Sequence, residues 1–406
     1  MLLSLITPTH VVSKYLEELF ESIKAQTYTN WQWILYCNGS AKSSSLPKEI
    51  LSDNRVKIIE DFSGNSDVGY LKNRAFKLGD GDILVEVDHD DLLVPDCLEK
   101  LALAFKSNDC DFVSSNCAIL DEGNDFIPFN PSLGWTYERY NFRERNLYSM
   151  KTFLPTSHSL AYIWYAPDHV RSWRRDFYHE IGGHNDKLSV CDDHDLLIRT
   201  YLFGRMLHVD DILYLYRTYP SNTVIIRNQQ IQETTQQLFS QNIEALVDKE
   251  ATLRGLKSLN LNTARFKDKG DIASDDSIIQ NLNLVENDSL FKVYIKDHSS
   301  HNVHPFELLQ LCYNKLVHGG WIGAELSAEI SADSILSEVK NYYWSKYLID
   351  YISTNEFQIV NPKYSFRFAF FEVREVLIEE NLNVLKLWAY AVKSETPRLP
   401  GFWPTN

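Results

Sequence analysis

A short apolar stretch of this sequence ends abruptly in a group of carboxylates. Residues 83–87 are mostly aliphatic and β-branched, which predicts a buried strand. Asp88, Asp90 and Asp91 follow at once, and Pro95 with the apolar spacing after it predicts a helix. Carboxylates at the carboxyl end of a sheet strand can hold a divalent cation that neutralises a diphosphate. The alternative is an acidic turn that only caps the following helix.

The residues before this strand alternate between strand and helix patterns. Strands are predicted at residues 2–6, 31–36 and 56–59, and helices at residues 15–23 and 70–78. Strand and helix in this order predict a right-handed parallel α/β sheet with ligand-binding loops at the carboxyl ends of its strands.

Composition limits the class of protein further. The chain has 406 residues, 44% of them hydrophobic, which is enough for two domains or one large domain. A formal net charge of -15 argues against nucleic-acid or anionic-membrane partners, whose phosphates would be repelled. Six scattered cysteines without a Cys-x-x-Cys pair favour reduced thiols, and we find neither a signal peptide nor an apolar run of roughly 18 residues. We therefore expect a soluble, cytoplasmic protein without a transmembrane segment.

Six groups of residues follow one another along the first part of the chain. They are Thr7-Pro8, Asn38-Gly39-Ser40, Lys72-Asn73-Arg74-Ala75, Asp88-His89-Asp90-Asp91, residues 181–186 with 191–199, and residues 214–217 with 221–223. In their order and ordinary spacing these motifs resemble those of family 2 glycosyltransferases, which have the GT-A fold (Rossmann-like nucleotide-diphospho-sugar transferases). The resemblance covers about residues 1–225.

The resemblance implies a nucleotide-sugar donor and a divalent metal. Asp90 is the expected metal ligand together with Asp88, and Mn²⁺ or Mg²⁺ would act as a Lewis acid on the leaving phosphate. The family usually has Asp where Asn38 stands. Asn can still accept a hydrogen bond from the uracil imide but has no charge, so a UDP-sugar is favoured only modestly over the alternatives, dTDP- and GDP-sugars. Arg217 would add positive charge or serve as a structural ion-pair partner. The expected donor-binding residues are Thr7, Pro8, Asn38, Lys72, Arg74, Asp88 and Arg217.

Asp193 is the expected general base, at the start of a predicted helix. Its neighbour Asp192 discourages its ionisation, which could raise one of the two pKa values towards a useful range. A base on the face opposite the leaving group implies inversion at the anomeric carbon. The alternative is an acidic helix cap. His208 either approaches the metal or merely ends a strand.

Residues 125–180 are irregular and carry many aromatic and basic side chains. Such side chains suit sugar rings and phosphates, but a segment that simply packs over the sheet is the equal alternative. Asp168 and His169 are candidates for a role in this segment.

Three parts are expected: a GT-A domain at 1–227, a connecting helix at 228–256 and a smaller α/β domain at 257–406. Residues 308–321 resemble a late helix, turn and strand of class I S-adenosylmethionine-dependent methyltransferases, in a helix that begins at Pro305 and that Gly319-Gly320 closes. Residues 373–393 would be their terminal strand pair. The expected cofactor loop, residues 259–268, contains no glycine, so we expect a degenerate domain without cofactor and with a structural or oligomerising role.

The leading hypothesis is an inverting, metal-dependent glycosyltransferase that moves a sugar to a glycan or polysaccharide acceptor. The alternatives are a bifunctional glycosyltransferase and methyltransferase, a nucleotidyltransferase, and a non-catalytic sugar-binding protein. A nucleotidyltransferase would normally have a Gly-rich, basic first loop, and the residues after the first predicted strand are Thr7-Pro8-Thr9-His10.

Overall fold

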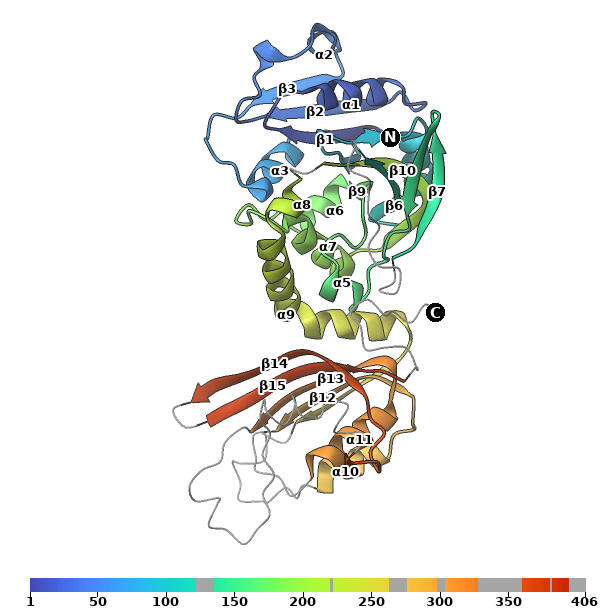
Figure 1. The fold of residues 1–406 in the computed structure, drawn as a ribbon, viewed down its shortest axis with the longest axis vertical. Helices are drawn as coiled ribbons and strands as arrows, with labels where there is room; N and C mark the ends of the chain where they lie inside the picture. The colour runs from blue at the N-terminus through green and yellow to red at the C-terminus, as the bar shows by residue number, and fades with distance from the viewer. Residues whose placement is uncertain are drawn as a thin grey trace. The chain divides into compact units, whose positions relative to one another are not determined.

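The computed structural model describes residues 1–121, 135–219, 222–262, 276–297, 304–327, 360–379 and 382–393. The chain divides into two compact units, Met1–Leu246 (unit 1) and Val247–Asn406 (unit 2). Figure 1 labels their helices and strands. Ser221 and most of the glycine-free stretch, residues 263–268, lie outside the described residues.

Unit 1 is built on one sheet with the strand order β3-β2-β1-β4-β9-β6-β10-β5, to which the β7–β8 hairpin is joined through β6. Its strands are β1 (Leu3–Thr9), β2 (Trp31–Cys37), β3 (Val56–Glu60), β4 (Ile83–Glu86), β5 (Leu92–Leu93), β6 (Phe112–Asp121), β7 (Tyr137–Phe142), β8 (Arg145–Met150), β9 (Arg171–Arg174) and β10 (Met206–Thr218).

The first four long strands form the parallel part of the sheet. β1 lies between β2 and β4 and is parallel to both, and β2 is parallel to β3. All four therefore end at the same edge of the sheet. This part agrees with the alternating pattern of the sequence, and the helices between these strands each bury an apolar face. In α1, for example, Leu16, Leu19, Phe20 and Ile23 are buried.

The sheet as a whole is mixed, because the strands that follow β4 extend the predicted parallel part with antiparallel pairs. β9 lies between β4 and β6 and is antiparallel to both. It has four residues and comes from the segment whose pattern is irregular, so periodicity could not reveal it. This strand places the fully buried Arg171 next to Glu86 at the end of β4.

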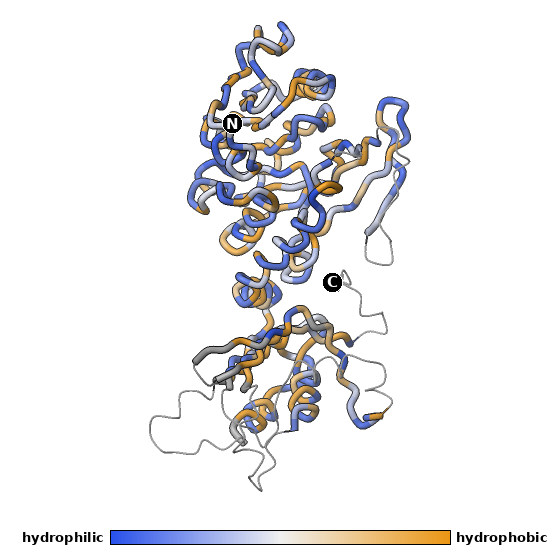
Figure 2. The backbone as a smooth tube through the Cα atoms, turned by 60° about the vertical axis from the view of Figure 1, so that its left-hand side comes forward, coloured by the Kyte–Doolittle hydropathy of each residue, from blue (hydrophilic) through white to orange (hydrophobic). Residues whose placement is uncertain are grey.

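Helices flank this sheet, and apolar and hydrophilic stretches alternate along them in Figure 2. They are α1 (Lys14–Lys24), α2 (Lys48–Ser52), α3 (Val68–Phe76), α4 (Cys97–Ser107), α5 (Ser159–Tyr162), α6 (Arg175–Glu180), α7 (Asp192–Phe203) and α8 (Thr223–Ile226). α9 (Asn228–Leu253) covers most of the predicted connecting helix, and the boundary between the units falls within it. No described helix combines the length and apolar character that crossing a membrane requires.

Unit 2 is a smaller α/β unit with the strand order β11-β12-β13-β15-β14. β11, β12 and β13 are parallel, and β15 runs antiparallel between β13 and β14. Its elements are β11 (Lys257–Asn262), α10 (Asp276–Asn283), β12 (Leu290–Asp297), α11 (Pro305–Lys315), β13 (Leu316–Ser327), β14 (Phe368–Glu379) and β15 (Leu382–Ala391).

The predicted end of the helix in unit 2 is wrong by about one turn. α11 ends at Lys315, and Gly319 and Gly320 lie inside β13 instead of closing the helix. The pairing of β13 with β12 is irregular here, and Gly319 has a φ of +74°. The glycines therefore serve a strand irregularity and not a helix cap.

Candidate active site

The loops that follow β1, β2 and β4 meet at one edge of the sheet in unit 1. The backbone N–H of Asn38 donates a hydrogen bond to the carbonyl of Thr9 at 2.9 Å. The rings of His10 and His89 make an edge contact, with centroids 5.1 Å apart. The carboxylates after β4 therefore lie beside the loops that follow β1 and β2.

A fully buried carboxylate, Glu86, lies at the centre of the site. Lys72 on α3 donates a hydrogen bond to its Oε1. Arg171 Nη1 and His169 Nε2 lie 3.6 and 3.9 Å from its Oε2. Burial alone would raise the pKa of Glu86, but the neighbouring Lys72 ammonium holds it well below its usual value. Glu86 is thus a fixed negative charge that organises the residues around it.

We call the ionisable residues around this carboxylate the Glu86 cluster. They come from α3, β4, β9, α7 and three loops, and all of them lie in unit 1. The members are Lys72, Glu86, Asp88, His169, Arg171, His184, Asp192 and Asp193.

The cluster holds more acidic than basic groups. Lys72 Nζ lies 3.4 Å from Asp88 Oδ1, and Arg171 pairs with Asp193. Two permanent cations therefore face four carboxylates, a difference that a bound divalent cation or protons on the carboxylates would offset. Burial alone would lower the pKa of Lys72, but Asp88 and Glu86 hold it well above its usual value, so Lys72 stays charged.

Glu86, Asp88 and His169 form a candidate metal site. Their ligand atoms lie within 4.8 Å of one another, and no other such group occurs among the residues that the structure describes. Glu86 Oε2 and His169 Nε2 are buried and have no hydrogen-bond partner there. Two carboxylates and an imidazole fit Mn²⁺ better than Mg²⁺, which prefers oxygen ligands.

Asp90, the metal ligand expected from the sequence, is not in this group. Its carboxylate accepts a hydrogen bond from the hydroxyl of Tyr219 instead. His208 is also elsewhere, with its Nδ1 3.3 Å from the hydroxyl of Ser114. Of the two expected ligands, the structure therefore brings Asp88 but not Asp90 into the acidic group.

Asp193 joins the cluster from the first turn of α7. Its Oδ2 accepts a hydrogen bond from Arg171 Nη1 at 2.8 Å, and its Oδ1 accepts one from the backbone of His194 at 2.8 Å. Its side chain is 22% exposed, whereas that of Asp192 is 4% exposed. Asp193 is therefore the carboxylate of this pair that a substrate can reach.

The pKa values of the two aspartates are shifted in opposite directions. Burial raises the pKa of Asp192 to about 6. Burial also opposes ionisation of Asp193, but the Arg171 guanidinium and the Lys72 ammonium together outweigh burial and lower the pKa of Asp193. It is thus the neighbour that has the raised pKa, and Asp193 is ionised at neutral pH, ready to accept a proton.

A glycine loop fixes the position of His184 in the cluster. Gly183 has a φ of +63°, and a Cβ atom there would lie 2.6 Å from the Tyr178 ring. Arg199 donates a hydrogen bond to the Gly183 carbonyl at 2.7 Å. The Tyr178 hydroxyl accepts from the His184 backbone and lies 2.7 Å from His184 Nδ1. This leaves His184 Nε2 facing Glu86 and Asp192, 3.8 Å from each.

Asp91 and Arg217 hold the acidic loop in place. Asp91 accepts hydrogen bonds from the backbone of Arg217 at 2.7 Å and from the hydroxyl of Tyr214 at 2.8 Å. The fully buried Arg217 side chain donates to the carbonyl of Asp90 at 2.6 Å and to Glu18 at 2.7 Å. These are the contacts of the structural ion-pair alternative.

The other expected donor-binding residues are placed in different ways. Asn38 is buried, and its Oδ1 has no hydrogen-bond partner among the described residues, so it can accept from a ligand. Pro8 is partly exposed at the same edge, and the Thr7 hydroxyl accepts a hydrogen bond from Trp33 inside the sheet. Arg74 lies exposed on α3 over the Tyr70 ring.

Sequence reasoning did not single out Glu86, Arg171 or His184. A signal existed for Glu86, because a carboxylate inside a strand of buried residues is rare unless it is paired. Arg171 and His184 lie in stretches that resemble the family, residues 166–173 and 181–186, but these stretches did not indicate a contact with Glu86, which is far from both along the chain.

Comparison with known proteins gives this site a family context. Residues 4–165 match the family Glycosyl transferase family 2. The match and the α/β architecture confirm the predicted fold class, a GT-A domain followed by a smaller α/β unit. Within unit 1, this glycosyltransferase region contains the β4 carboxylates and ends just before His169.

Curated relatives are also glycosyltransferases. The chain is 26% identical to glycosyltransferase GlyG of Streptococcus pneumoniae serotype 4 over 53% of this chain and 70% of that protein. It is 30% identical to the O-antigen biosynthesis glycosyltransferase WbnJ of Escherichia coli over 31% of this chain and 50% of that protein. A solved structure of S. aureus TarS 1-349 with UDP has a TM-score of 0.43 and 16% identity, covering 63% of this chain and 76% of that one.

Proposed function

We propose that unit 1 is an inverting, metal-dependent glycosyltransferase that moves a sugar from a nucleotide-sugar donor to a glycan acceptor. One observation carries this proposal: Arg171 connects a reachable, ionised Asp193 to Glu86, which belongs to the candidate metal site. The expected acceptor-side base and the expected donor-side carboxylate Asp88 thereby belong to a single cluster. The family match at residues 4–165 supplies the reaction class.

Asp193 acts as the general base in this proposal. Its Oδ2 accepts the proton of the acceptor hydroxyl, and Arg171 orients the carboxylate and keeps it ionised. Attack from the side opposite the leaving diphosphate inverts the anomeric carbon. Proton acceptance of this kind is typically worth ~10²–10⁴-fold in rate.

The donor diphosphate binds at the acidic edge of the sheet. Asp88, with Glu86 and His169, would hold Mn²⁺, and the ion would stabilise negative charge on the leaving phosphate. The buried carbonyl oxygen of Asn38, which has no hydrogen-bond partner among the described residues, would accept the imide N–H of uracil, and this favours a UDP-sugar. Thymine carries the same imide, so a dTDP-sugar is the next candidate and a GDP-sugar follows.

The role of Asp193 is tested by Asp193→Asn, which keeps the shape of the side chain and removes its proton-accepting charge. We expect turnover to fall by ~10²–10⁴-fold while calorimetric donor affinity stays nearly unchanged. The matched control is Asp186→Asn, an exposed residue of the same sequence motif, which should keep normal turnover. Near-normal transfer by Asp193→Asn would exclude it as the base.

The metal ligands are tested by titrating UDP, dTDP and GDP with and without Mn²⁺. His169→Gln should remove the Mn²⁺-dependent part of UDP affinity, because it removes an imidazole ligand. Asp90→Asn should remove it only if Asp90 moves to the metal when the donor binds, so the two variants separate the two ligand sets. Equal UDP affinity with and without Mn²⁺ in the unmodified protein would refute the metal site.

We further propose that unit 2 is a methyltransferase-like domain that binds no cofactor and has a structural or oligomerising role. The antiparallel pair β14 and β15 supports this proposal, because the resemblance requires a terminal strand pair at this place.

A further inference from the structure

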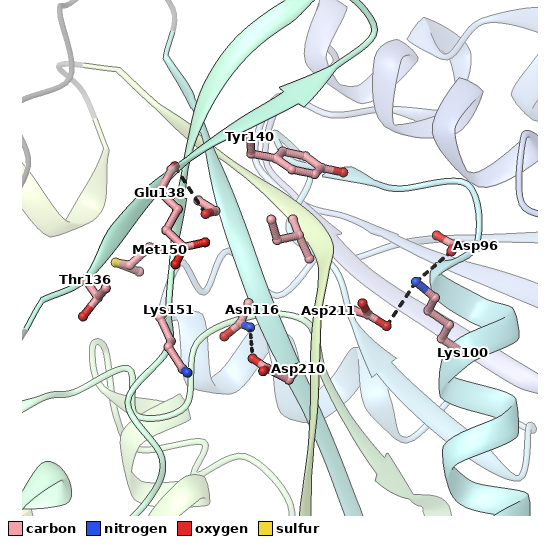
Figure 3. A pocket seen from close by; sticks show the side chains of 12 residues that line it. Asp96, Lys100, Asn116, Thr136, Glu138, Tyr140, Met150, Lys151, Asp210 and Asp211 are labelled. Atoms are coloured by element: carbon pink, nitrogen blue, oxygen red, sulfur yellow. Dashed lines mark hydrogen bonds and ion pairs between the residues drawn. The ribbon is translucent and has the colours of Figure 1, made fainter. Parts of the chain in front are cut away.

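A hollow in unit 1 is bordered by the β7–β8 hairpin, by β6 and β10, and by the start of α4 (Figure 3). Its volume is about 430 Å³, within the range of small-molecule and saccharide sites. None of the members of the Glu86 cluster lines it. It is therefore a site separate from the reacting carboxylates.

The charges around the hollow exclude an anionic ligand. Its lining includes four carboxylates and two ammonium groups: Asp96, Glu138, Asp210, Asp211, Lys100 and Lys151. Lys100 is already paired with Asp96 at 2.9 Å and with Asp211 at 3.1 Å. A phosphate or sulfate would meet a net negative surface, and the mostly polar lining does not suit a lipid chain.

An irregularity in the backbone of β10 brings two of these carboxylates to the hollow. The pairing of β10 with β6 is irregular between Val209 and Ile212, so the two consecutive aspartates 210 and 211 both reach the hollow. Asp210 accepts a hydrogen bond from Asn116 at 2.8 Å, as Figure 3 shows. The half-buried Tyr140 adds an aromatic ring to the same lining.

We propose that this hollow holds an uncharged oligosaccharide segment of the acceptor or product, an inference that rests on the function proposed above. Carboxylates accept hydrogen bonds from sugar hydroxyls, and an amide both accepts and donates them. An aromatic ring covers the C–H face of a pyranose. A neutral polyhydroxylated ligand is the chemical class that meets all of these groups.

A chain of hydrogen bonds links the lining of the hollow to the Glu86 cluster. Asn116 accepts a hydrogen bond from the backbone of Thr152 at 3.1 Å, and the Thr152 hydroxyl accepts one from the backbone of Asp168 at 2.7 Å. The next residue is His169 of the Glu86 cluster. An oligosaccharide held here would keep a growing glycan bound beside the place where sugar is added.

The test uses the full chain and neutral tetrasaccharides from β-glucan, chitin and galactan, with carboxylated and phosphorylated tetrasaccharides alongside. Binding is measured by saturation-transfer NMR without donor, then by calorimetry. The variants are Tyr140→Ala and Glu138→Gln, with Arg139→Ala as the control, because Arg139 lies between them on β7 but does not line the hollow. Thermal unfolding verifies that each variant is folded.

We expect binding of at least one neutral tetrasaccharide, weakened about tenfold by Tyr140→Ala and by Glu138→Gln, and unchanged by Arg139→Ala. No binding across the panel, binding insensitive to Tyr140→Ala, or stronger binding of the phosphorylated probes would overturn the proposal. Nucleotide-sugar turnover without glycan binding would refute the proposed oligosaccharide site but not the proposed transferase. Glycan binding sensitive to Tyr140→Ala in a protein that uses no nucleotide sugar would support the hollow and overturn the proposed transferase.

Discussion

Replacing Arg171 with methionine removes a fully buried guanidinium that contacts both Asp193 and Glu86. Arg171 Nη1 lies 2.8 Å from Asp193 Oδ2 and 3.6 Å from Glu86 Oε2. Methionine fills a similar volume with a flexible, apolar side chain. Glu86 keeps the Lys72 ammonium in Arg171→Met, whereas Asp193 loses its charged hydrogen-bond partner.

Breaking a buried pair by removing one partner costs about 3–5 kcal/mol. The Asp193 side chain is 22% exposed, so water compensates part of the loss, and we expect the lower end, about 3 kcal/mol. For a unit of this size that corresponds to a fall in Tm of about 6–12 °C. The pKa of Asp193 should also rise, because the Arg171 guanidinium lowers it in the unmodified protein.

A double-mutant cycle measures the coupling. We expect Arg171→Met with Asp193→Asn to be more stable than the sum of the single changes by about 1–3 kcal/mol, because the orphaned charge is gone. Calorimetric unfolding gives these free energies. In Arg171→Met the acid limb of the pH profile of turnover should lie at a higher pH than in the unmodified protein, because the pKa of Asp193 is higher.

Additivity of the two changes within about 0.5 kcal/mol would refute the coupling. The control is Arg174→Met on the same strand, whose guanidinium donates to the carbonyls of Cys110 and Phe105 at 2.6 and 2.8 Å. Its effect should add to that of Asp193→Asn. If the acid limb of the pH profile does not move in Arg171→Met, Arg171 does not set the ionisation of Asp193.

Three further outcomes are expected. The pKa of Asp192 is raised from 3.8 to about 6, so its stabilising contribution is complete below pH ~4 and is lost as the pH rises through 6. Asp192→Asn should therefore be more stable than the unmodified protein at pH 8, by about 3 kcal/mol, but not at pH ~4. Urea unfolding at the two pH values measures this difference. Gly183→Ala should lower Tm more than Gly182→Ala, because both have positive φ but only the Gly183 Cβ would strike the Tyr178 ring, at 2.6 Å, whereas the nearest atom at Gly182 is 3.7 Å away; equal losses would contradict the clash. S-adenosylmethionine should not shift the unfolding of the full chain, and micromolar binding would make the protein bifunctional.

The sequence by itself determined the parallel half of unit 1 and the acidic edge of its sheet. Local patterns suffice there, because strand and helix periodicity, Pro95 and the carboxylates after β4 all act within a few residues of one another. Parallel strands end at a common edge, so the order of elements alone brings Asn38 and Asp88 to the same side of the sheet.

Only the tertiary structure decided how the charges are shared. Arg171 reaches Glu86 because β9 is inserted antiparallel between β4 and β6, and Asp193 reaches Arg171 from a helix that follows later in the chain. A pKa depends on burial and on charges a few ångströms away in space, so adjacency in sequence could not show that Asp192 is raised and Asp193 lowered. The ionisation of Asp193 was therefore fixed by contacts between residues far apart in the chain.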